Sequence, residues 1–531
     1  MSMMNGKEYI ESLRKYKPKV YFMGKKVENV VDEPMFRPHI HAAAMTYELA
    51  HDPRYENIMT ATSHLTGDKI NRFTHIHQSV EDLVKKVRMM RLLGQKTGTC
   101  FQRCVGFDAL NALYITTYDI DKKCGTEYHE RFKEYLKYVQ KNDLMCVGAM
   151  TDVKGDRSLR PHQQADPDLY VRIIEKREDG IVVRGAKAHM TGAVNSHEVI
   201  VMSTRAMGPE DKDYAVSFAV PIDAEGLINI FVRQTNDTRR LDGDIDCGNA
   251  KYGIVGGETL MIFNDVFVPW ERVFMCGEYE FAGQLVEIFA TFHRQNYGGC
   301  KVGVADVLIG AVANIAEYNG VAGASHIVDK ITEMIHLAET CWCCSLACSY
   351  EGYRTPSGAY MPNPLLANVT KLNVTRFPYE WSRLAQDIAG GLVITTPSEK
   401  DYRNPETREF IEKYLKGKAE VPTEHRIRIF RLIENMSVGA QLPESMHGAG
   451  SPQAQKIMIF RRGNIEMKKE LAKVIAGINP DEHFRKIVGK SEEEFFREML
   501  EKFKGVNRIK DLLKKIYDDW NKILWGLQLN L

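Results

Sequence analysis

The spacing of apolar residues changes twice along the chain. From about residue 5 to 145 they recur every three to four positions, as in SVEDLVKKVRMMRLLGQ and YHERFKEYLKYVQKN, which predicts helices. From about 146 to 275 they gather in short β-branched and aromatic runs such as HEVIVMSTR and ETLMIFNDVFVPWERV, which indicates strands separated by turns. From about 280 to 475 the helical spacing returns in long segments, including KVGVADVLIGAVANIAEYNG and PYEWSRLAQDIAGG.

These changes predict an α+β protein built in four parts. We expect an N-terminal helical domain over 1–145, a middle β domain, a barrel or sandwich, over 146–275, a C-terminal helical bundle over 276–475, and an amphipathic helical tail over 476–531. Helices of this length joined by short connections favour a bundle, and the tail is expected to pack on it or on a neighbouring subunit.

Composition excludes several classes of function. The chain has 531 residues, and its 44% hydrophobic content is enough for a large core. With 71 basic and 70 acidic residues, nothing in the bulk charge favours nucleic acid or an anionic membrane. No apolar run looks long enough to cross a bilayer, and the first residues lack the apolar stretch of a signal peptide. Eleven cysteines without a disulfide-scaffold spacing agree with a reducing compartment, so we expect a cytoplasmic protein.

Two short pairs of metal-ligand residues lie far apart in the sequence. Cys100 and Cys104 lie in TGTCFQRCVG, and His293 and Cys300 lie in TFHRQNYGGCKVG. Each pair shares one face if its segment is helical. Three thiolates and one imidazole suit a soft metal or an iron-sulfur cluster, whereas the wide separation argues against a zinc ribbon. Spacing alone also fits ordinary buried thiols.

The second pair belongs to a longer stripe. His293, Tyr297, Cys300 and Lys301 follow an i, i+4, i+7, i+8 pattern, so one helix face would carry two ligands, a phenol and an amine. The glycine pair 298–299 weakens the helix, but it would let the backbone approach a bulky inorganic cofactor. This stripe is typical of a reaction site.

Other cysteines and histidines have ordinary explanations. Cys341, Cys344 and Cys348 could suggest a second metal site, but small thiols on an apolar helix face usually fill helix–helix contacts. His75 and His77 are two residues apart and do not share a helix face, so surface or structural roles are expected.

The runs CFQRC, MTDVKGDRS, KAHMTGA, HRQNYGGC and ESMHGAGSPQAQ together resemble the 4-hydroxybutyryl-CoA dehydratase family over roughly residues 5 to 475. That family lies in a broader group with the flavin-dependent 4-hydroxyphenylacetate hydroxylases. The resemblance implies the acyl-CoA dehydrogenase fold, with its helical, β, helical order. It also implies a 4Fe-4S cluster held by Cys100, Cys104, His293 and Cys300. The hydroxylases share the fold and reduced-flavin binding but lack this ligand set.

The resemblance also implies FAD. The implied contacts are Met150, Thr151, Asp152, Lys154 and Arg157 in the first β-domain run, Thr191 in the second, and Gly390 and Gly391 in QDIAGGLVITTPSE. The last loop resembles one that reaches the flavin of an adjacent subunit, which implies a homotetramer. Without the family these are common turn sequences. The absence of a GxGxxG pattern favours flavin over nicotinamide.

The implied reaction is the dehydration of 4-hydroxybutyryl-CoA to crotonyl-CoA, with vinylacetyl-CoA delta-isomerase activity as a second outcome of the same proton transfers. The family route takes the α proton, borrows one electron through a transient flavin radical, and uses the cluster as a Lewis acid on the departing hydroxyl.

By the same resemblance, five residues carry the acid–base chemistry: His293, Tyr297, Lys301, Glu258 and Glu444. His293 would act as a base, Tyr297 would protonate the leaving hydroxyl, and Lys301 would hold it or a carboxylate by charge. Two alternatives remain open: an FADH2-dependent aromatic hydroxylase without a cluster, and a non-enzymatic oligomer with a structural metal.

Overall fold

The computed structural model describes residues 3–235, 237–253 and 257–479, and Glu482, Glu494 and Arg497 singly. The chain divides into two compact units, Met1–Lys456 and Ile457–Leu531. Helix α16 (Pro452–Arg462) crosses the boundary, and α17 (Ile465–Ile475) belongs to the second unit. The predicted tail over 476–531 lies almost wholly outside the described residues.

The N-terminal part is largely helical, but it also contributes strands. Its helices are α1 (Gly6–Leu13), α2 (Arg37–Glu48), α3 (Glu56–Met59), α4 (Val80–Thr97), α5 (Cys104–Cys124) and α6 (Tyr128–Lys141). Its strands are β1 (Lys19–Phe22), β2 (Lys25–Val27), β3 (Thr60–Thr62) and β4 (Lys69–Asn71). β1 pairs in parallel with β10, so the N-terminal segment joins a sheet of the middle part. Strands of three or four residues are too short for a readable alternation.

The middle part contains two sheets. Its strands are β5 (Cys146–Ala149), β6 (Arg172–Lys176), β7 (Gly180–Thr191), β8 (Glu198–Val201), β9 (Val216–Pro221), β10 (Leu227–Phe231), β11 (Glu258–Pro269) and β12 (Val273–Cys276). One sheet has the order β2-β1-β10-β11-β7-β6 and the other β12-β9-β8-β5. Phe218 and Phe263, one from each sheet, pack ring to ring at 5.8 Å within one shared core. The α+β class is therefore confirmed.

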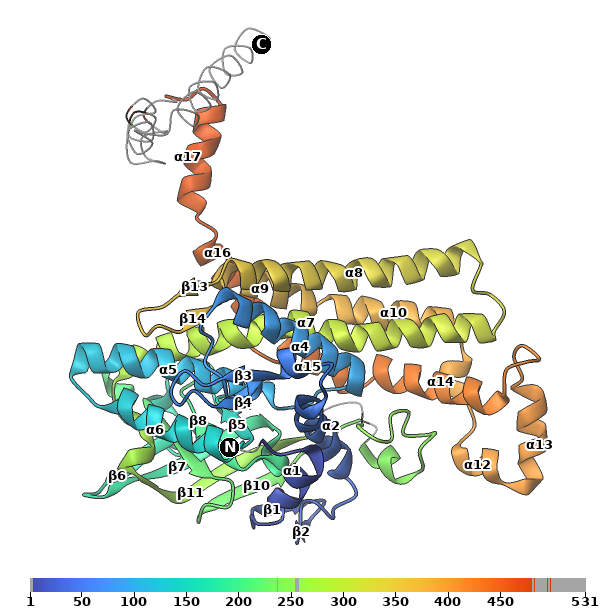
Figure 1. Cartoon of the computed structure of the whole chain (residues 1–531), viewed down its shortest axis with the longest axis horizontal. Helices are drawn as coiled ribbons and strands as arrows, with labels where there is room; N and C mark the ends of the chain where they lie inside the picture. Colours follow the sequence, from blue (N-terminus) through green and yellow to red (C-terminus); the bar gives the residue numbers. More distant parts are fainter. Residues whose placement is uncertain are drawn as a thin grey trace. The chain divides into compact units, whose positions relative to one another are not determined.

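The C-terminal part is helical, as predicted. Its helices are α7 (Ala282–Tyr318), α8 (Ser325–Tyr350), α9 (Pro364–Val374), α10 (Phe377–Ala389), α11 (Leu392–Thr395), α12 (Glu399–Arg403), α13 (Pro405–Tyr414), α14 (Thr423–Ser437) and α15 (Gln441–His447), with the small pair β13 (Tyr353–Arg354) and β14 (Tyr360–Met361). α7, α8 and α10 run side by side, and α4 and α5 also pack against α7 (Figure 1). α7 is thus the helix that the functional site is built around.

α7 contains a longer apolar run than we predicted from the sequence. Among the described residues, the helical stretch Tyr279–Tyr318 contains an 18-residue window of mean hydropathy 1.5, long and apolar enough to cross a membrane. The expectation that no run reaches this length is therefore wrong. The share of that window buried inside the protein is 61%, and six other helices surround α7. Burial among helices explains the composition, because a core helix needs apolar residues on all sides.

The glycines of α7 serve helix packing. A Cβ atom at Gly303 would lie 2.1 Å from the Arg91 carbonyl oxygen of α4, and one at Gly299 would lie 2.6 Å from that of Val87. A Cβ at Gly298 would lie 2.5 Å from the Ser345 side chain. The expectation that residues 298 and 299 admit an inorganic cofactor is therefore wrong, because neighbouring helices already occupy that space. The glycines instead bring α4 and α8 close to the stripe.

Two of the other cysteines, and the histidine pair singled out in the sequence, lie in the core. Cys341 and Cys348 are fully buried, as expected for thiols that fill helix–helix contacts. His75 and His77 are also buried. Of the surface and structural roles expected for them, burial leaves the structural one.

Candidate active site

The predicted stripe forms one face of α7. His293, Tyr297 and Lys301 are buried along it, and Cys300 is half-buried. The His293 and Tyr297 rings meet edge to face with centroids 5.5 Å apart, and the Lys301 ammonium lies 5.7 Å from the Tyr297 ring centroid. One uninterrupted helix therefore carries an imidazole, a phenol and an amine that follow one another along one face.

Glu444 of α15 connects this stripe to the C-terminal helices. The Tyr297 hydroxyl donates to Glu444 Oε1 at 2.9 Å, and the Lys301 ammonium pairs with Oε2. Burial alone would raise the pKa of Glu444, but the Lys301 charge and the two hydrogen bonds outweigh it and lower that pKa. Burial raises the pKa of Tyr297 well above 10. The site thus holds an ionised carboxylate beside a protonated phenol.

Glu258 is a second carboxyl group in the same place. It begins β11, opposite Thr191 of β7, whose hydroxyl donates to it at 3.4 Å. The Gln234 amide donates to its other oxygen at 3.1 Å. Burial, and then the nearby charge of Glu444, raise the pKa of Glu258 to about 7. The pKa values of the two glutamates are therefore shifted in opposite directions, which is typical of acid–base sites.

Three predicted metal ligands come together beside these groups. Cys100 lies just before α5, Cys104 begins α5, and Cys300 lies on α7. Burial raises the pKa of Cys100 and Cys300 to about 12, and burial with the other two sulfurs raises the pKa of Cys104 further. Such thiols stay protonated unless a cation compensates the thiolates.

Three thiols and one imidazole are donors of the kind that soft metals and iron-sulfur clusters take. Within the described part of the chain, no three or more His, Cys, Asp or Glu residues are arranged to hold one metal ion. In a 4Fe-4S cluster each ligand binds a different iron, so the ligands surround the cofactor and do not converge on one point. The backbone N–H of Gln102 also bonds the Cys100 sulfur, a contact of the kind that tunes cluster potentials. His293 lies on α7 two turns before Cys300, with its Nδ1 bonded to Asp108.

The predicted flavin residues of the β domain divide into two groups. Asp152 is buried, and its carboxylate pairs with the Lys187 ammonium at 2.6 Å and accepts a hydrogen bond from the Thr204 hydroxyl at 2.5 Å. Lys187 also donates to the Met150 carbonyl at 2.8 Å. By contrast, Thr151, Lys154 and Thr191 are only half-buried, with Arg157 exposed next to Lys154.

The second β-domain run lies close to the end of α15. Burial and the charges of Lys154 and His447 lower the pKa of His189, which places that histidine near both. Thr191, two residues on, contacts Glu258. The half-buried flavin candidates and the acid–base glutamates therefore border the same region. Gly390 and Gly391 are exposed, with open space where a Cβ would be.

Sequence reasoning missed Lys371, which supports the Glu444 segment from α9. Its ammonium donates to the carbonyl oxygens of Ser445 at 2.7 Å and Met446 at 3.2 Å, and it lies 4.6 Å from the Tyr297 ring centroid. Burial lowers the pKa of Lys371 to about 7. The sequence feature that could have indicated Lys371 is its position as a single lysine in the apolar run of α9.

Gly448 brings the end of α15 onto the tyrosine. A Cβ at this position would lie 1.8 Å from the Tyr297 hydroxyl oxygen, so only glycine permits the approach. Arg294 donates to the Ala449 carbonyl at 3.0 Å and so ties the next residue to α7. The distance from Glu444 to Tyr297 is therefore set by several contacts beyond the hydrogen bond itself.

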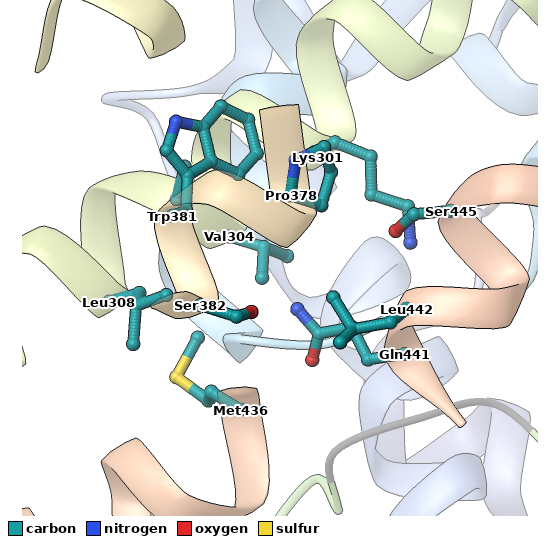
Figure 2. Close-up of a pocket in the computed structure, with 11 residues that line it drawn as sticks. Lys301, Val304, Leu308, Pro378, Trp381, Ser382, Met436, Gln441, Leu442 and Ser445 are labelled. Carbon is teal, nitrogen blue, oxygen red and sulfur yellow. The ribbon is translucent and has the colours of Figure 1, made fainter. Parts of the chain in front are cut away.

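A recess of about 280 Å³, part of it open to solvent, lies next to Lys301. Figure 2 shows it between Trp381, Ser382 and Leu308 on one side and Gln441, Leu442 and Ser445 on the other. It leaves space beside the Lys301 side chain that the protein itself does not fill.

Comparisons with known proteins identify the family of the chain. Residues 5–275 match the family model "4-hydroxyphenylacetate 3-hydroxylase N terminal", and residues 282–477 match its "C terminal" counterpart. The chain is 59% identical to a 4-hydroxybutyryl-CoA dehydratase/vinylacetyl-CoA-Delta-isomerase of Clostridium aminobutyricum, over 90% of this chain and 100% of that protein.

Two solved structures extend the comparison. An oxygen-tolerant archaeal 4-hydroxybutyryl-CoA dehydratase from N. maritimus is 54% identical, with a TM-score of 0.88 over 93% of this chain and 100% of that one. The oxygenase component of 4-hydroxyphenylacetate 3-monooxygenase, solved with FAD and 4-hydroxyphenylacetate, is 26% identical, with a TM-score of 0.78 over 89% of this chain and 98% of that one.

Proposed function

The chain belongs to the 4-hydroxyphenylacetate 3-hydroxylase family, on its 4-hydroxybutyryl-CoA dehydratase branch, and from this premise we infer its reaction. It is a flavoprotein lyase that dehydrates 4-hydroxybutyryl-CoA to crotonyl-CoA and isomerises vinylacetyl-CoA. Both reactions move protons on neighbouring carbons of a CoA thioester, so one set of acid–base groups serves both.

One observation carries this proposal: Tyr297 and Lys301 converge on Glu444 beside three thiols, one buried and two half-buried. A hydroxylase that relies on flavin alone has no use for such thiols. The alternative of a non-enzymatic oligomer leaves the protonated phenol, the ammonium and the two contrasting glutamates without a role.

We propose that Cys100, Cys104, Cys300 and His293 hold a 4Fe-4S cluster and that the half-buried Thr151 and Thr191 border FAD. When bound, the flavin supplies reversible one-electron chemistry and the cluster a Lewis-acidic iron. The exposed Gly390–Gly391 loop supports a homotetramer in which each loop meets a neighbour's flavin. We also propose that the chain has the three-part layout of acyl-CoA dehydrogenases, with a closed β domain.

The chain's own residues handle the protons. Tyr297 keeps its proton and can give it to a departing hydroxyl when its O–H turns from Glu444 to the substrate, and the Lys301 ammonium beside Glu444 offsets the negative charge then left on the phenol oxygen. Glu258, with its pKa at about 7, can both take and return a proton near neutral pH. His293, enclosed between the Phe289 and Tyr297 rings, would be the remaining base only when its Nε2 is not bound to iron.

The test is a measurement of iron, acid-labile sulfide and flavin per subunit on anaerobically purified protein. About four irons and one FAD are expected, since a 4Fe-4S cluster contains four irons. The Cys300→Ala variant should lose most of the iron but keep the flavin, whereas Cys343→Ala, at an exposed cysteine, should keep both. An anaerobic assay of crotonyl-CoA formation follows. Flavin without iron, even after reconstitution, would refute the proposal and favour an FADH2-dependent aromatic hydroxylase.

A further inference from the structure

A fully buried carboxylate lies directly behind the predicted histidine ligand. Asp108, on α5 one turn after Cys104, accepts a hydrogen bond from His293 Nδ1 at 2.8 Å and another from the Asn296 amide at the same oxygen, Oδ2. Its other oxygen, Oδ1, accepts from the Lys86 ammonium at 2.6 Å. Three helices, α4, α5 and α7, therefore converge on this one side chain.

The arrangement divides the two oxygens of Asp108 between two tasks. Lys86 neutralises the carboxylate at Oδ1 and is itself anchored by a 3.0 Å hydrogen bond to the Phe292 carbonyl. Oδ2 remains free to accept from His293, with Asn296 fixing its direction. A charge pair between Lys86 and Asp108 would not by itself require this second set of contacts.

An acceptor at Nδ1 determines the chemistry of the imidazole. A neutral ring that donates through Nδ1 has its lone pair on Nε2, and a carboxylate behind a ligating histidine makes that nitrogen more basic. The ring cannot turn freely, because Phe289 stacks on it with centroids 5.4 Å apart and Tyr297 meets its edge at 5.5 Å.

We propose that Asp108 is a positioning residue that holds His293 in the Nδ1–H form, so that Nε2 is the nitrogen that binds iron. This inference rests on the proposed function, since it requires the cluster. Lys86 and Asn296 hold the carboxylate in its orientation. Sequence spacing alone contained a trace of this role, because Asp108 follows Cys104 by four residues on one helix face.

The decisive variant is Asp108→Asn, which changes no volume. Lys86 demands an oxygen at the Oδ1 position, so the amide NH2 must face His293 Nδ1 and oppose its N–H. The ring is then driven to the Nε2–H form, which cannot bind iron. In the double variant Lys86→Met/Asp108→Asn no ammonium needs an acceptor at the Oδ1 position, so the asparagine oxygen can turn to His293. Lys86→Met alone keeps the original acceptor.

The readouts are the 57Fe Mössbauer spectrum of reconstituted holoprotein and the rate of iron loss to a chelator. Asp108→Asn should lose the signal of the histidine-bound iron and release iron about 10- to 100-fold faster, the usual effect of removing a partner of a ligand. In the double variant, the signal of the histidine-bound iron and the rate of iron loss should return towards those of Lys86→Met. A purely structural role of Asp108 predicts instead that the effects of the two substitutions on iron binding add. Replacing the buried Glu198–Arg272 pair of the β region by Leu and Met should leave the spectrum unchanged.

Two results would overturn the inference: an Asp108→Asn spectrum and iron-loss rate equal to wild type, or a double variant worse than Asp108→Asn. If Asp108→Asn fails to fold, Lys86→Met/Asp108→Leu takes its place, with neither acceptor nor buried charge, and the same loss of signal is expected. Wild-type protein that binds flavin but no iron would refute the proposed function itself, and with it this assignment.

Discussion

Replacing Glu258 by glutamine should make the protein more stable at alkaline pH. The Glu258 carboxyl is enclosed at the start of β11, where burial and the charge of Glu444 raise its pKa from an ordinary 4.5 to about 7. Glutamine has nearly the same shape but cannot ionise: its one oxygen can accept from the Gln234 amide while its NH2 donates to the Thr191 hydroxyl oxygen. The substitution therefore removes the cost of ionising a buried group and little else.

The sign follows from proton binding. Between pH 4.5 and 7 the folded chain keeps a proton on Glu258 that the unfolded chain has lost, so the free energy of unfolding falls as pH rises through this window. Each unit of pKa difference corresponds to about 1.4 kcal/mol, so wild type loses about 3 kcal/mol across it. At about 2.1 cal/mol/K per residue, the 531-residue chain has an unfolding entropy near 1.1 kcal/mol/K. The advantage of Glu258→Gln is therefore about 3 °C in Tm above pH 7.

Calorimetric scans of both proteins, loaded with flavin and kept anaerobic, at several values between about pH 5 and 8 would measure this difference. The gap in Tm should grow from almost zero at the acid end to its full value at the alkaline end. Glu225→Gln, at an exposed position in the turn before β10, controls for the loss of one negative charge. A Tm gap that does not change with pH would refute the reasoning, because it would mean that Glu258 does not titrate in this window. The pH profile of kcat/KM should also lose its ionisation near 7 in Glu258→Gln.

Three further substitutions test the contacts around the tyrosine. Tyr297→Phe removes the hydroxyl that donates to Glu444, so crotonyl-CoA formation should fall by about 10²- to 10⁴-fold, while iron and flavin contents stay at wild-type levels; an unchanged rate would exclude a proton-donor role. Gly448→Ala places a methyl group 1.8 Å from the Tyr297 oxygen and should lower activity by at least tenfold, whereas Gly310→Ala, in open space on α7, should be neutral in the same assay. Lys371→Met removes the donor to two α15 carbonyls and should lower both Tm and kcat; an effect on KM alone would contradict this positioning role.

Local periodicity was enough to predict the order of the parts. Helical spacing before residue 145 and after 280, with strands between, corresponds to the observed elements, because each helix or strand must present its own apolar face to a core. It was not enough for β1 and β2, which have three or four residues each: β1 pairs with the distant strand β10, and β2 pairs with β1. It also gave the wrong role to the glycines of α7, since only the neighbouring helices show what occupies the space beside them.

The site divides in the same way. By itself the sequence determined that His293, Tyr297, Cys300 and Lys301 share a face, because a single helix period sets that relation, and its motif runs identified the family. Only the tertiary structure decided that Glu444, 143 residues after Lys301, pairs with that lysine. It also decided that Asp108 lies behind His293 and that the pKa values of the two glutamates shift in opposite directions. A pKa depends on burial and on the charges within a few ångströms, and the folded chain alone brings those charges together.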